Sequence, residues 1–405
     1  MQLGGGLLIA TLVPYVVRTY LDTGYGKESL DFALTGTIVA LLAGYLSFRQ
    51  TSRFPGVKVA YGILPTFGLS YGLVMAAFLL LRIDYSRLQF VSSFFLCIVW
   101  YHLVHWMMRR SRPLFAILPF GRVAGLKDVP GPDWVEIDSH SDEVGPVDAI
   151  VADLHADIPS EWERFLADQA LNGVLVFHVK QVRESLTGRV EIEHLSENTF
   201  GSLIPGIVYA KVKRVIDFLA ALMLALPVLI MLIPAGIAIR LNSPGPIFFR
   251  QRRVGYRGDT FTVLKLRTMR SGVESDGDPR EAAITRDFDD RITRVGRFLR
   301  YYRLDELPQL INVLKGEMSW IGPRPEAVPL AEWYEAELPF YRYRHIVRPG
   351  VTGWAQVNQG HVAAVGDVLW KLHYDFFYIR NFSFWLDVLI VARTVRTLLT
   401  GYGSK

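Results

Sequence analysis

The sequence predicts a membrane α/β protein with four N-terminal transmembrane helices, a small cytosolic α/β module and a mainly helical domain associated with the membrane. Hydrophobic residues make up 51% of the 405 residues, which is high for a soluble protein and indicates membrane spans. The apolar residues gather in long runs, and the charged residues separate into an acidic middle and a basic C-terminal part. We therefore divide the chain into three predicted domains, residues 1–112, 113–203 and 204–405.

The N-terminal region contains four apolar runs, of which the first is short for a membrane span and the last two are long enough to cross a bilayer. Basic residues without acidic ones lie between the second and third runs and directly after the fourth. The positive-inside rule places both of these segments in the cytoplasm. Gly68 and Gly72 form a GxxxG pattern, which predicts close helix packing. The four runs are Leu3–Val17, Phe32–Phe48, Val59–Leu81 and Leu88–Met108.

The middle of the chain is acidic, with 6 Lys/Arg against 16 Asp/Glu from Pro113 to Phe200. Residues 147–154 and 173–179 have the composition of strands, and residues 160–171 between them have a helical pattern. This order predicts a βαβ unit in a Rossmann-like module. Its glycines do not form a G-x-G-x-x-G loop, so we expect no nucleotide site and a role in positioning or oligomerisation.

A fifth apolar run, Phe218–Ile239, contains 22 uncharged residues and is long enough to span the membrane. Basic residues such as Lys211 and Arg250 lie on both flanks, which favours a cytoplasmic location for both ends. Pro227 lies near the middle and favours a bend there. A re-entrant helix at about 215–240 explains both the basic flanks and the central proline. An ordinary kinked transmembrane helix is an equal alternative when only the residues are considered.

The part from Arg240 to Arg303 is basic, with 15 Lys/Arg against 8 Asp/Glu. A basic surface suits nucleic acid, anionic lipid or phosphate compounds. Because no nucleic-acid-binding motif accompanies it, we expect lipid and phosphate and no nucleic acid. Residues 374–399 mix aromatics, aliphatics and spaced arginines, which predicts helices lying in the headgroup region.

Asp305 and Glu306 lie directly before Pro308–Lys315, a predicted helix whose N-terminus favours anions. The ordinary structural explanation is an N-cap aspartate with an acidic neighbour. The basic side chains nearby in sequence favour instead a site for a di-anionic phosphate and a divalent metal. A carboxylate can attack phosphorus while its neighbour holds Mg²⁺. The basic residues are Arg253, Lys265, Arg267, Arg300, Arg303 and Arg324.

Five motifs in this C-terminal part occur in a fixed order. They are FRQRRVG, KLRTM, RITRVGRFLR, LDELPQLINVLKGEMSWIGPRPE and RPGVTGWAQVN. Together they resemble the bacterial polyprenyl-phosphate sugar-1-phosphate transferases, the phosphoglycosyl transferases that begin exopolysaccharide and O-antigen assembly. The resemblance covers the chain from about Lys211 onward, and the N-terminal spans with the α/β module resemble the long form of the family.

The resemblance implies transfer of a sugar 1-phosphate from a UDP-sugar to undecaprenyl phosphate, with release of UMP and a covalent aspartyl intermediate. Asp305 matches the nucleophile, Glu306 the Mg²⁺-binding residue, and Pro227 the bend of a re-entrant helix. The expected location is the bacterial inner membrane, with the catalytic domain on the cytoplasmic face. The expected oligomeric state is a homo-oligomer, a dimer. Matches to substrate-binding positions are Lys265, Arg300, Pro323, Arg324 and Pro325, and the adjacent Arg267 and Arg303 join this set.

Three other classes of protein fit the sequence less well. A nucleotide-sugar oxidoreductase needs a glycine-rich dinucleotide loop, and a transporter places ionisable groups within its spans, which here hold almost none. A non-catalytic membrane scaffold would keep the spans and the basic stretches but would have no need of Asp305 and Glu306 beside these arginines. The single cysteine, Cys97, excludes an internal disulfide and a multi-cysteine metal site.

Overall fold

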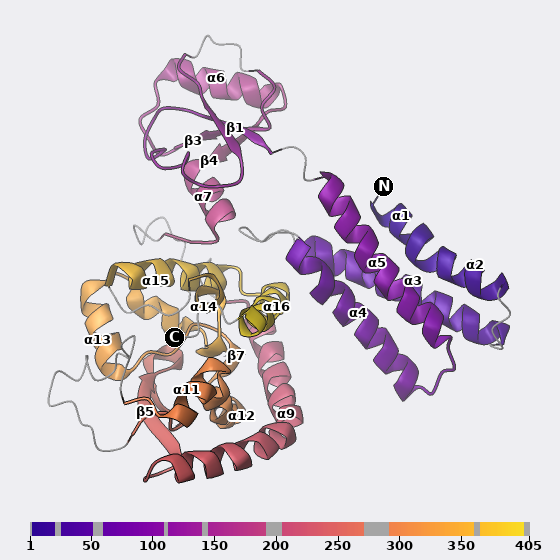
Figure 1. The fold of residues 1–405 in the computed structure, drawn as a ribbon. Helices are drawn as coiled ribbons and strands as arrows, with labels where there is room; N and C mark the ends of the chain where they lie inside the picture. Colours follow the sequence, from indigo (N-terminus) through magenta and orange to yellow (C-terminus); the bar gives the residue numbers. More distant parts are fainter. Residues whose placement is uncertain are drawn as a thin grey trace. The chain divides into compact units, whose positions relative to one another are not determined.

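The computed structural model describes residues 2–20, 26–51, 60–108, 112–139, 145–191, 205–270, 291–359 and 365–400. The chain forms two compact units, Met1–Gly188 and Arg189–Lys405. The first unit contains a bundle of apolar helices and a small α/β module, and the second contains the motifs around Asp305 (Figure 1). The predicted boundary between residues 203 and 204 lies outside the described residues.

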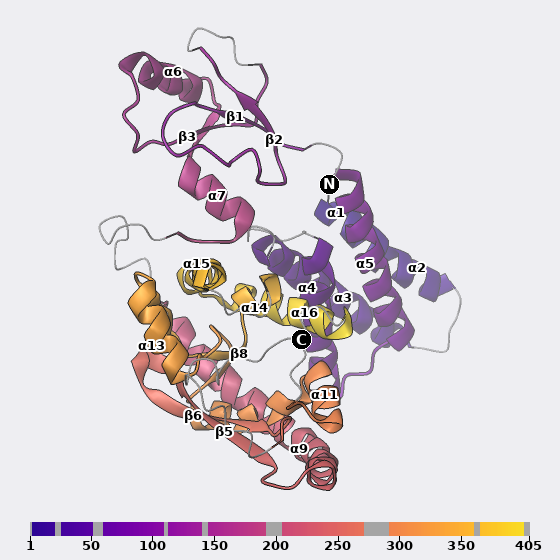
Figure 2. The same ribbon diagram turned by 60° about the vertical axis from the view of Figure 1, so that its left-hand side comes forward.

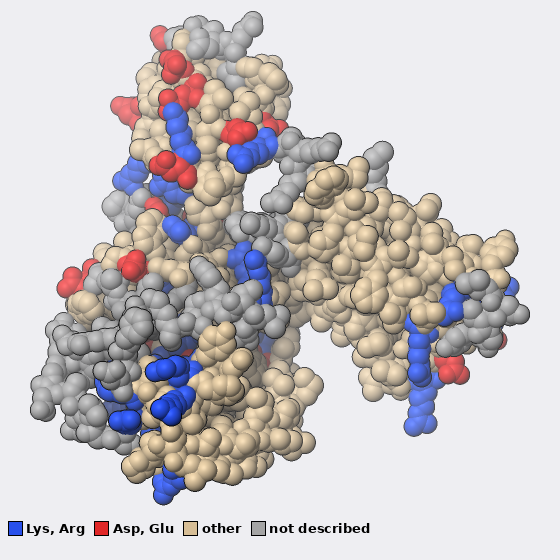
Figure 3. Space-filling model, viewed as in Figure 1, with Lys and Arg blue, Asp and Glu red and all other residues tan. Residues whose placement is uncertain are grey.

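The four predicted apolar runs all lie on helices, and each helix is long and apolar enough to cross a membrane. The first run, short in the sequence, is part of a helical segment that extends from Gln2 to Tyr20. The bundle consists of α1 (Gln2–Leu7), a π-helical turn (Leu8–Leu12), α2 (Val13–Tyr20), α3 (Lys27–Thr51), α4 (Ala60–Leu80) and α5 (Arg87–Met108). In Figure 3 its visible surface is almost free of charged side chains between the ends of the helices.

Aromatic side chains fill the centre of the bundle, where the Phe67 and Tyr101 rings lie 4.5 Å apart. Helices α3 and α4 approach closely at Gly44, because a Cβ there would lie 2.4 Å from the Phe67 ring. A Cβ at Gly68 or Gly72 would meet no described atom within 4 Å. The close packing predicted at the GxxxG pattern is therefore not found among the described residues.

The α/β module has a parallel four-stranded sheet in the order β2-β1-β3-β4. Ile150 and Ala152 pack in the cluster with α6, whereas Val151 packs with α7, so one helix covers each face of the sheet (Figure 2). The predicted βαβ unit is confirmed as β3, α6 and β4. The elements are β1 (Leu114–Ile117), β2 (Asp133–Glu136), β3 (Ala149–Ala152), α6 (Ser160–Leu171), β4 (Leu175–His178) and α7 (Val179–Thr187).

The fifth apolar run lies on α9 (Ile207–Asn242), a helix of 36 residues that contains Pro227 and Pro234. Figure 1 shows that α9 bends sharply, as prolines inside a helix favour. Its N-terminal part is fixed to the domain by Arg214, which donates to the Val313 and Leu314 carbonyls at 2.6 and 2.9 Å. Much of its apolar surface is exposed in the isolated chain.

The rest of the second unit combines short helices with two small sheets. Strands β5 (Phe248–Val254) and β6 (Thr260–Leu266) form an antiparallel hairpin, and β7 (Ser319–Ile321) pairs in parallel with β8 (Gly350–Thr352). The α-helices are α11 (Arg294–Tyr301), α12 (Leu310–Lys315), α13 (Val328–Glu337), α14 (Trp354–Asn358), α15 (Val365–Arg380) and α16 (Phe384–Thr400). The 3₁₀ turns are η2 (Tyr256–Gly258), η3 (Leu304–Gln309) and η4 (Tyr341–Ile346).

Helix α15 packs into the domain more deeply than the sequence predicts. Residues 374–379 are buried on all sides of the helix, and Trp354 stacks on Phe377 with the ring centroids 5.5 Å apart. The interpretation of this stretch as a helix lying in lipid headgroups is therefore wrong for residues 374–379. Aromatic residues are equally suited to membrane interfaces and to protein cores, so composition alone did not separate the two.

Candidate active site

Asp305 and Glu306 lie in the first turn of η3, which continues directly into α12. The predicted helix therefore exists, but its helical backbone begins earlier, as a 3₁₀ turn. Arg303 has a φ of 54°, a left-handed conformation that separates α11 from η3. Gly316, with a φ of 86°, ends α12 as predicted. The acid pair is thus held at a rigid corner between two short helices.

Glu306 is a buried carboxylate whose charge is neutralised by two cations. Its Oε1 accepts hydrogen bonds from Lys265 Nζ at 2.9 Å and from Arg324 Nη2 at 2.8 Å. Burial alone would raise the pKa of Glu306, but the charges of Arg324 and Lys265 outweigh it and hold the pKa well below the ordinary value. Glu306 is therefore ionised at neutral pH.

Asp305 is half-buried, whereas its neighbour Glu306 is buried. Among the described residues, none forms a hydrogen bond or ion pair with the Asp305 carboxylate. Burial raises its pKa, the Glu306 charge adds to the rise, and Lys265, Arg300 and Arg324 only partly oppose it. The side chain is thus available to a substrate, and ligands that bring positive charge would stabilise its ionised form.

Lys265 reaches Glu306 from β6, and Asn312 on α12 holds the two elements together. Asn312 Oδ1 accepts the Leu264 N–H at 3.2 Å, and Asn312 Nδ2 donates to the Thr262 carbonyl at 2.8 Å. Because these bonds hold the part of the strand directly before Lys265, they fix the position of Lys265 opposite Glu306. Asn312 is buried inside the predicted helix, and a polar amide among its apolar residues is the sequence signal for these bonds.

The loop that carries Arg324 is fixed at each of three successive carbonyl groups. The Pro323 carbonyl accepts from the Gly350 N–H at 2.9 Å. The Arg324 carbonyl accepts from Arg344 Nη2 at 2.9 Å, and the Pro325 carbonyl accepts from Arg253. With the φ angles of two prolines also restricted, this loop has little freedom to move Arg324.

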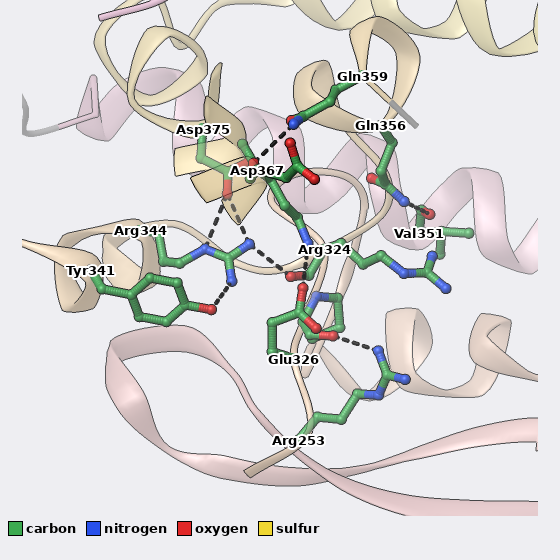
Figure 4. A network of polar contacts seen from close by, with 12 residues as sticks. Arg253, Arg324, Glu326, Tyr341, Arg344, Val351, Gln356, Gln359, Asp367 and Asp375 are labelled. Atoms are coloured by element: carbon green, nitrogen blue, oxygen red, sulfur yellow. Dashed lines mark hydrogen bonds and ion pairs between the residues drawn. The ribbon is translucent and has the colours of Figure 1, made fainter. Parts of the chain in front are cut away.

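A buried charge network lies behind this loop (Figure 4). Arg344 donates to Asp375 Oδ2 through Nε at 3.0 Å and Nη2 at 2.8 Å, and both side chains are 2% exposed. Arg344 also donates to the Tyr341 hydroxyl at 2.6 Å, and Lys371 pairs with Glu326. This network was not predicted from the sequence, although Asp375, a lone aspartate inside an apolar aromatic run, is a signal for it.

The remaining predicted residues divide into two groups. Arg300 Nε donates to Thr268 Oγ1 at 2.9 Å, and the charge of Arg300 partly opposes the rise in the pKa of Asp305. Arg267 instead donates to the Ser243 and Pro244 carbonyls at 2.7 and 2.8 Å, where it fixes the chain that follows α9. Figure 3 shows a group of Lys and Arg side chains over α11.

The donor set fits a Mg²⁺ ion. Mg²⁺ prefers carboxylate oxygens and is usually held by one or two carboxylates together with substrate phosphates. Glu306 Oε1 is occupied by its two cations, and within the described part of the chain Oε2 has no partner. Glu306 Oε2 is therefore the oxygen that would hold the ion, and the adjacent Asp305 carboxylate would stay available to the substrate.

Comparison with known proteins identifies the class. The model of the bacterial sugar transferase family matches residues 208–401. The UDP-N-acetylgalactosamine-undecaprenyl-phosphate N-acetylgalactosaminephosphotransferase of Aeromonas hydrophila is 44% identical over 375 residues, 92% of this chain and 88% of that protein. A UDP-glucose:undecaprenyl-phosphate glucose-1-phosphate transferase of Caulobacter vibrioides is 45% identical over 202 residues, 49% of this chain and 74% of that protein.

The membrane helices and the acid pair among cations thus belong to an enzyme, a phosphoglycosyl transferase. The chain is a member of the bacterial polyprenyl-phosphate sugar-1-phosphate transferase family. This result excludes the non-catalytic scaffold that the sequence analysis considered. The relative from Aeromonas hydrophila covers the N-terminal unit as well, so the similarity is not confined to the part that contains Asp305.

Proposed function

We propose that the chain transfers a sugar 1-phosphate from a UDP-sugar to undecaprenyl phosphate, releasing UMP and forming undecaprenyl-diphospho-sugar. The observation that carries this proposal is the contrast within the acid pair. Glu306 is held by Lys265 and Arg324, whereas the adjacent Asp305 carboxylate has no partner among the described residues. An unpartnered carboxylate beside fixed cations has the arrangement of a nucleophile toward a phosphate group.

The reaction has two displacement steps at one phosphorus atom. A carboxylate oxygen of Asp305 attacks the β-phosphorus of the UDP-sugar, and the bond from that phosphorus to the bridging oxygen breaks. UMP leaves with the bonding electron pair, and the sugar phosphate stays on Asp305 as an acyl phosphate. A phosphate oxygen of undecaprenyl phosphate then attacks the same phosphorus and displaces the Asp305 carboxylate. The enzyme is regenerated, because the Asp305 carboxylate takes the bonding electron pair and leaves as an anion without accepting a proton.

The cations around the pair would stabilise the charge that develops on the phosphoryl oxygens. Arg324 and Lys265 are already fixed by Glu306, and Arg300 is held by Thr268, so little reorganisation is needed when substrate binds. Mg²⁺ bound through Glu306 Oε2 would neutralise part of the diphosphate charge. We assign Pro323 and Pro325 the role of holding Arg324 near the uridine end of the donor. Arg303 would contact substrate phosphate. For Arg267 we also propose substrate binding, in addition to its bonds to the Ser243 and Pro244 carbonyls.

The membrane arrangement follows from the basic flanks of α9. We propose that α9 enters the membrane, bends at Pro227 and returns to the cytoplasmic face of the bacterial inner membrane. The site would then meet its lipid acceptor at the membrane surface, in the first membrane step of exopolysaccharide or O-antigen assembly. The predicted domains at residues 1–112, 113–203 and 204–405 and the expected dimer form part of the same proposal.

The donor we propose to test first is UDP-N-acetylgalactosamine, because the relative whose alignment covers 92% of this chain is named for it. Purified protein is mixed with this donor and Mg²⁺ without lipid, and UMP is measured. We expect UMP up to about one per active site, because the first step does not need the acceptor. Asp305→Asn should release none, whereas Asp259→Asn, an exposed aspartate of the same unit, should behave as the native protein. UMP release that strictly requires undecaprenyl phosphate would contradict the covalent route.

A further inference from the structure

Three metal-binding side chains converge at the carboxyl edge of the parallel sheet in the α/β module. Asp153 and His155 follow β3, and His178 is the last residue of the neighbouring strand β4. His178 Nε2 lies 2.8 Å from His155 Nδ1 and 3.4 Å from Asp153 Oδ1. One ligand atom from each residue lies within 4.8 Å of the other two. The carboxyl edge is where open parallel sheets bind ligands.

The Asp153 carboxylate is oriented by the backbone around it. Oδ2 accepts the Arg122 N–H at 2.9 Å, and Oδ1 accepts the His155 N–H at 3.2 Å. Gly121 has a φ of 70°, and a Cβ at this position would lie 2.5 Å from Asp153 Oδ2. The turn at Gly121 therefore leaves space for the carboxylate and supplies one of the N–H groups that fix it. Hydrogen bonds of this kind orient the ligands of metal sites.

His178 is fixed by a different contact. Its Nδ1 accepts the Lys180 N–H at 3.0 Å and caps α7, so the neutral ring carries its proton on Nε2. That proton is donated to His155 Nδ1 in the metal-free arrangement. A metal ion at Nε2 requires the proton to move to Nδ1, which gives up the cap. Metal binding and the cap of α7 therefore compete, and the competition lowers the affinity of the site.

We propose that Asp153, His155 and His178 bind one divalent transition-metal ion of the Zn²⁺ type. Two imidazoles and one carboxylate suit Zn²⁺, whereas Mg²⁺ and Ca²⁺ prefer oxygen ligands alone. Asp153 is buried, His178 is half-buried and His155 is exposed, so the ion would be reached from solvent. Such an ion would join the loop after β3 to the start of α7. The proposal does not depend on the proposed sugar transfer.

The test uses the full chain in detergent micelles, purified without a histidine tag. Zn²⁺ is titrated by calorimetry with Mg²⁺ in large excess, so that sites of oxygen ligands are occupied, and bound zinc is counted after dialysis. We expect one Zn²⁺ per chain and an affinity lower by about tenfold or more in Asp153→Asn, His155→Gln and His178→Gln. Asp157 and His102 are exposed residues of the same unit. Their variants Asp157→Asn and His102→Gln should bind Zn²⁺ as tightly as the native protein does.

His155→Gln decides the outcome, because its exposed side chain can change without disturbing the fold of the module. Zn²⁺ should raise the Tm of the native chain and leave the Tm of this variant unchanged. UMP release should be unaffected in all three variants, which separates this result from that of the proposed function. The absence of zinc binding to the native chain, or equal zinc affinity in the native chain and His155→Gln, would overturn the proposal.

Discussion

Replacement of Asp375 by asparagine tests whether the buried charge network supports the Arg324 loop. Asp375 accepts two hydrogen bonds from Arg344, at 3.0 and 2.8 Å, and both side chains are 2% exposed. Asp375→Asn removes the charge that neutralises a buried guanidinium. Loss of one partner of a buried ion pair costs about 3–5 kcal/mol, and the remaining amide oxygen favours the lower end, about 3 kcal/mol. For a unit of this size this corresponds to a Tm lower by about 6–12 °C.

The same substitution should also lower the rate of transfer. Arg344 Nη2 donates to the Arg324 carbonyl at 2.9 Å, so a displaced Arg344 releases the loop that presents Arg324 to Glu306. We expect kcat to fall by about ten- to a hundredfold, because small displacements of catalytic groups have effects of this size. Tm is measured by scanning calorimetry in detergent, and rate by UMP formation with both substrates.

Glu136→Gln is the matched control for this experiment. Glu136 pairs with Lys127 at 2.6 Å on the surface of the α/β module, with side chains 48% and 55% exposed. Exposed ion pairs contribute about 0–1 kcal/mol, so Tm and kcat should hardly change. If Asp375→Asn changes Tm and kcat no more than Glu136→Gln does, the support assigned to the Arg344 network is wrong.

Three further predictions concern pH, charge and topology. Burial, and then the Arg344 and Arg342 charges, lower the pKa of His345 from 6.5 to about 3. The unfolded chain takes up this proton first, so stability should fall as pH drops below 6.5, by about 2 kcal/mol at pH 5. His345→Gln should lose less Tm than the native chain between pH 7 and pH 5, and an equal loss in the two would refute the assignment. Lys265→Met should reduce kcat by about 10²–10³-fold, whereas Lys315→Met, an exposed lysine of α12, should not, and similar rates for the two variants would remove Lys265 from the mechanism. Single cysteines at Lys211 and Arg250 in a Cys97→Ser background should both resist a membrane-impermeant thiol reagent in intact cells, and labelling at Arg250 alone would reveal a full span.

Local patterns in the sequence predicted much of the fold. The apolar runs located the long helices, and alternation with a helical pattern located β3, α6 and β4. The β5–β6 hairpin was missed because β5 is basic and largely exposed, so no alternation of apolar residues marks this strand. Close packing was expected at Gly68 and Gly72 but occurs at Gly44, because which glycine meets an aromatic ring depends on how the helices are rotated.

The acid pair could be predicted because its residues are adjacent and its basic neighbours lie in recognisable motifs. The groups that fix it could not, because tertiary structure brings them from distant parts of the chain. Arg344 and Asp375 are 31 residues apart, and Asn312 bonds to a carbonyl 50 residues away. The upward shift in the pKa of Asp305 was also missed, since charge counting along the sequence takes no account of burial.

Direct detection of the covalent intermediate is the most direct test of the central claim. Protein is incubated with a UDP-sugar labelled in the sugar, without undecaprenyl phosphate, then quenched, digested and analysed by mass spectrometry. We predict a sugar-phosphate adduct on the peptide containing Asp305, which disappears when undecaprenyl phosphate is added before the quench and is absent in Asp305→Asn. Full turnover by Asp305→Asn, or an adduct on a different residue, would contradict the mechanism.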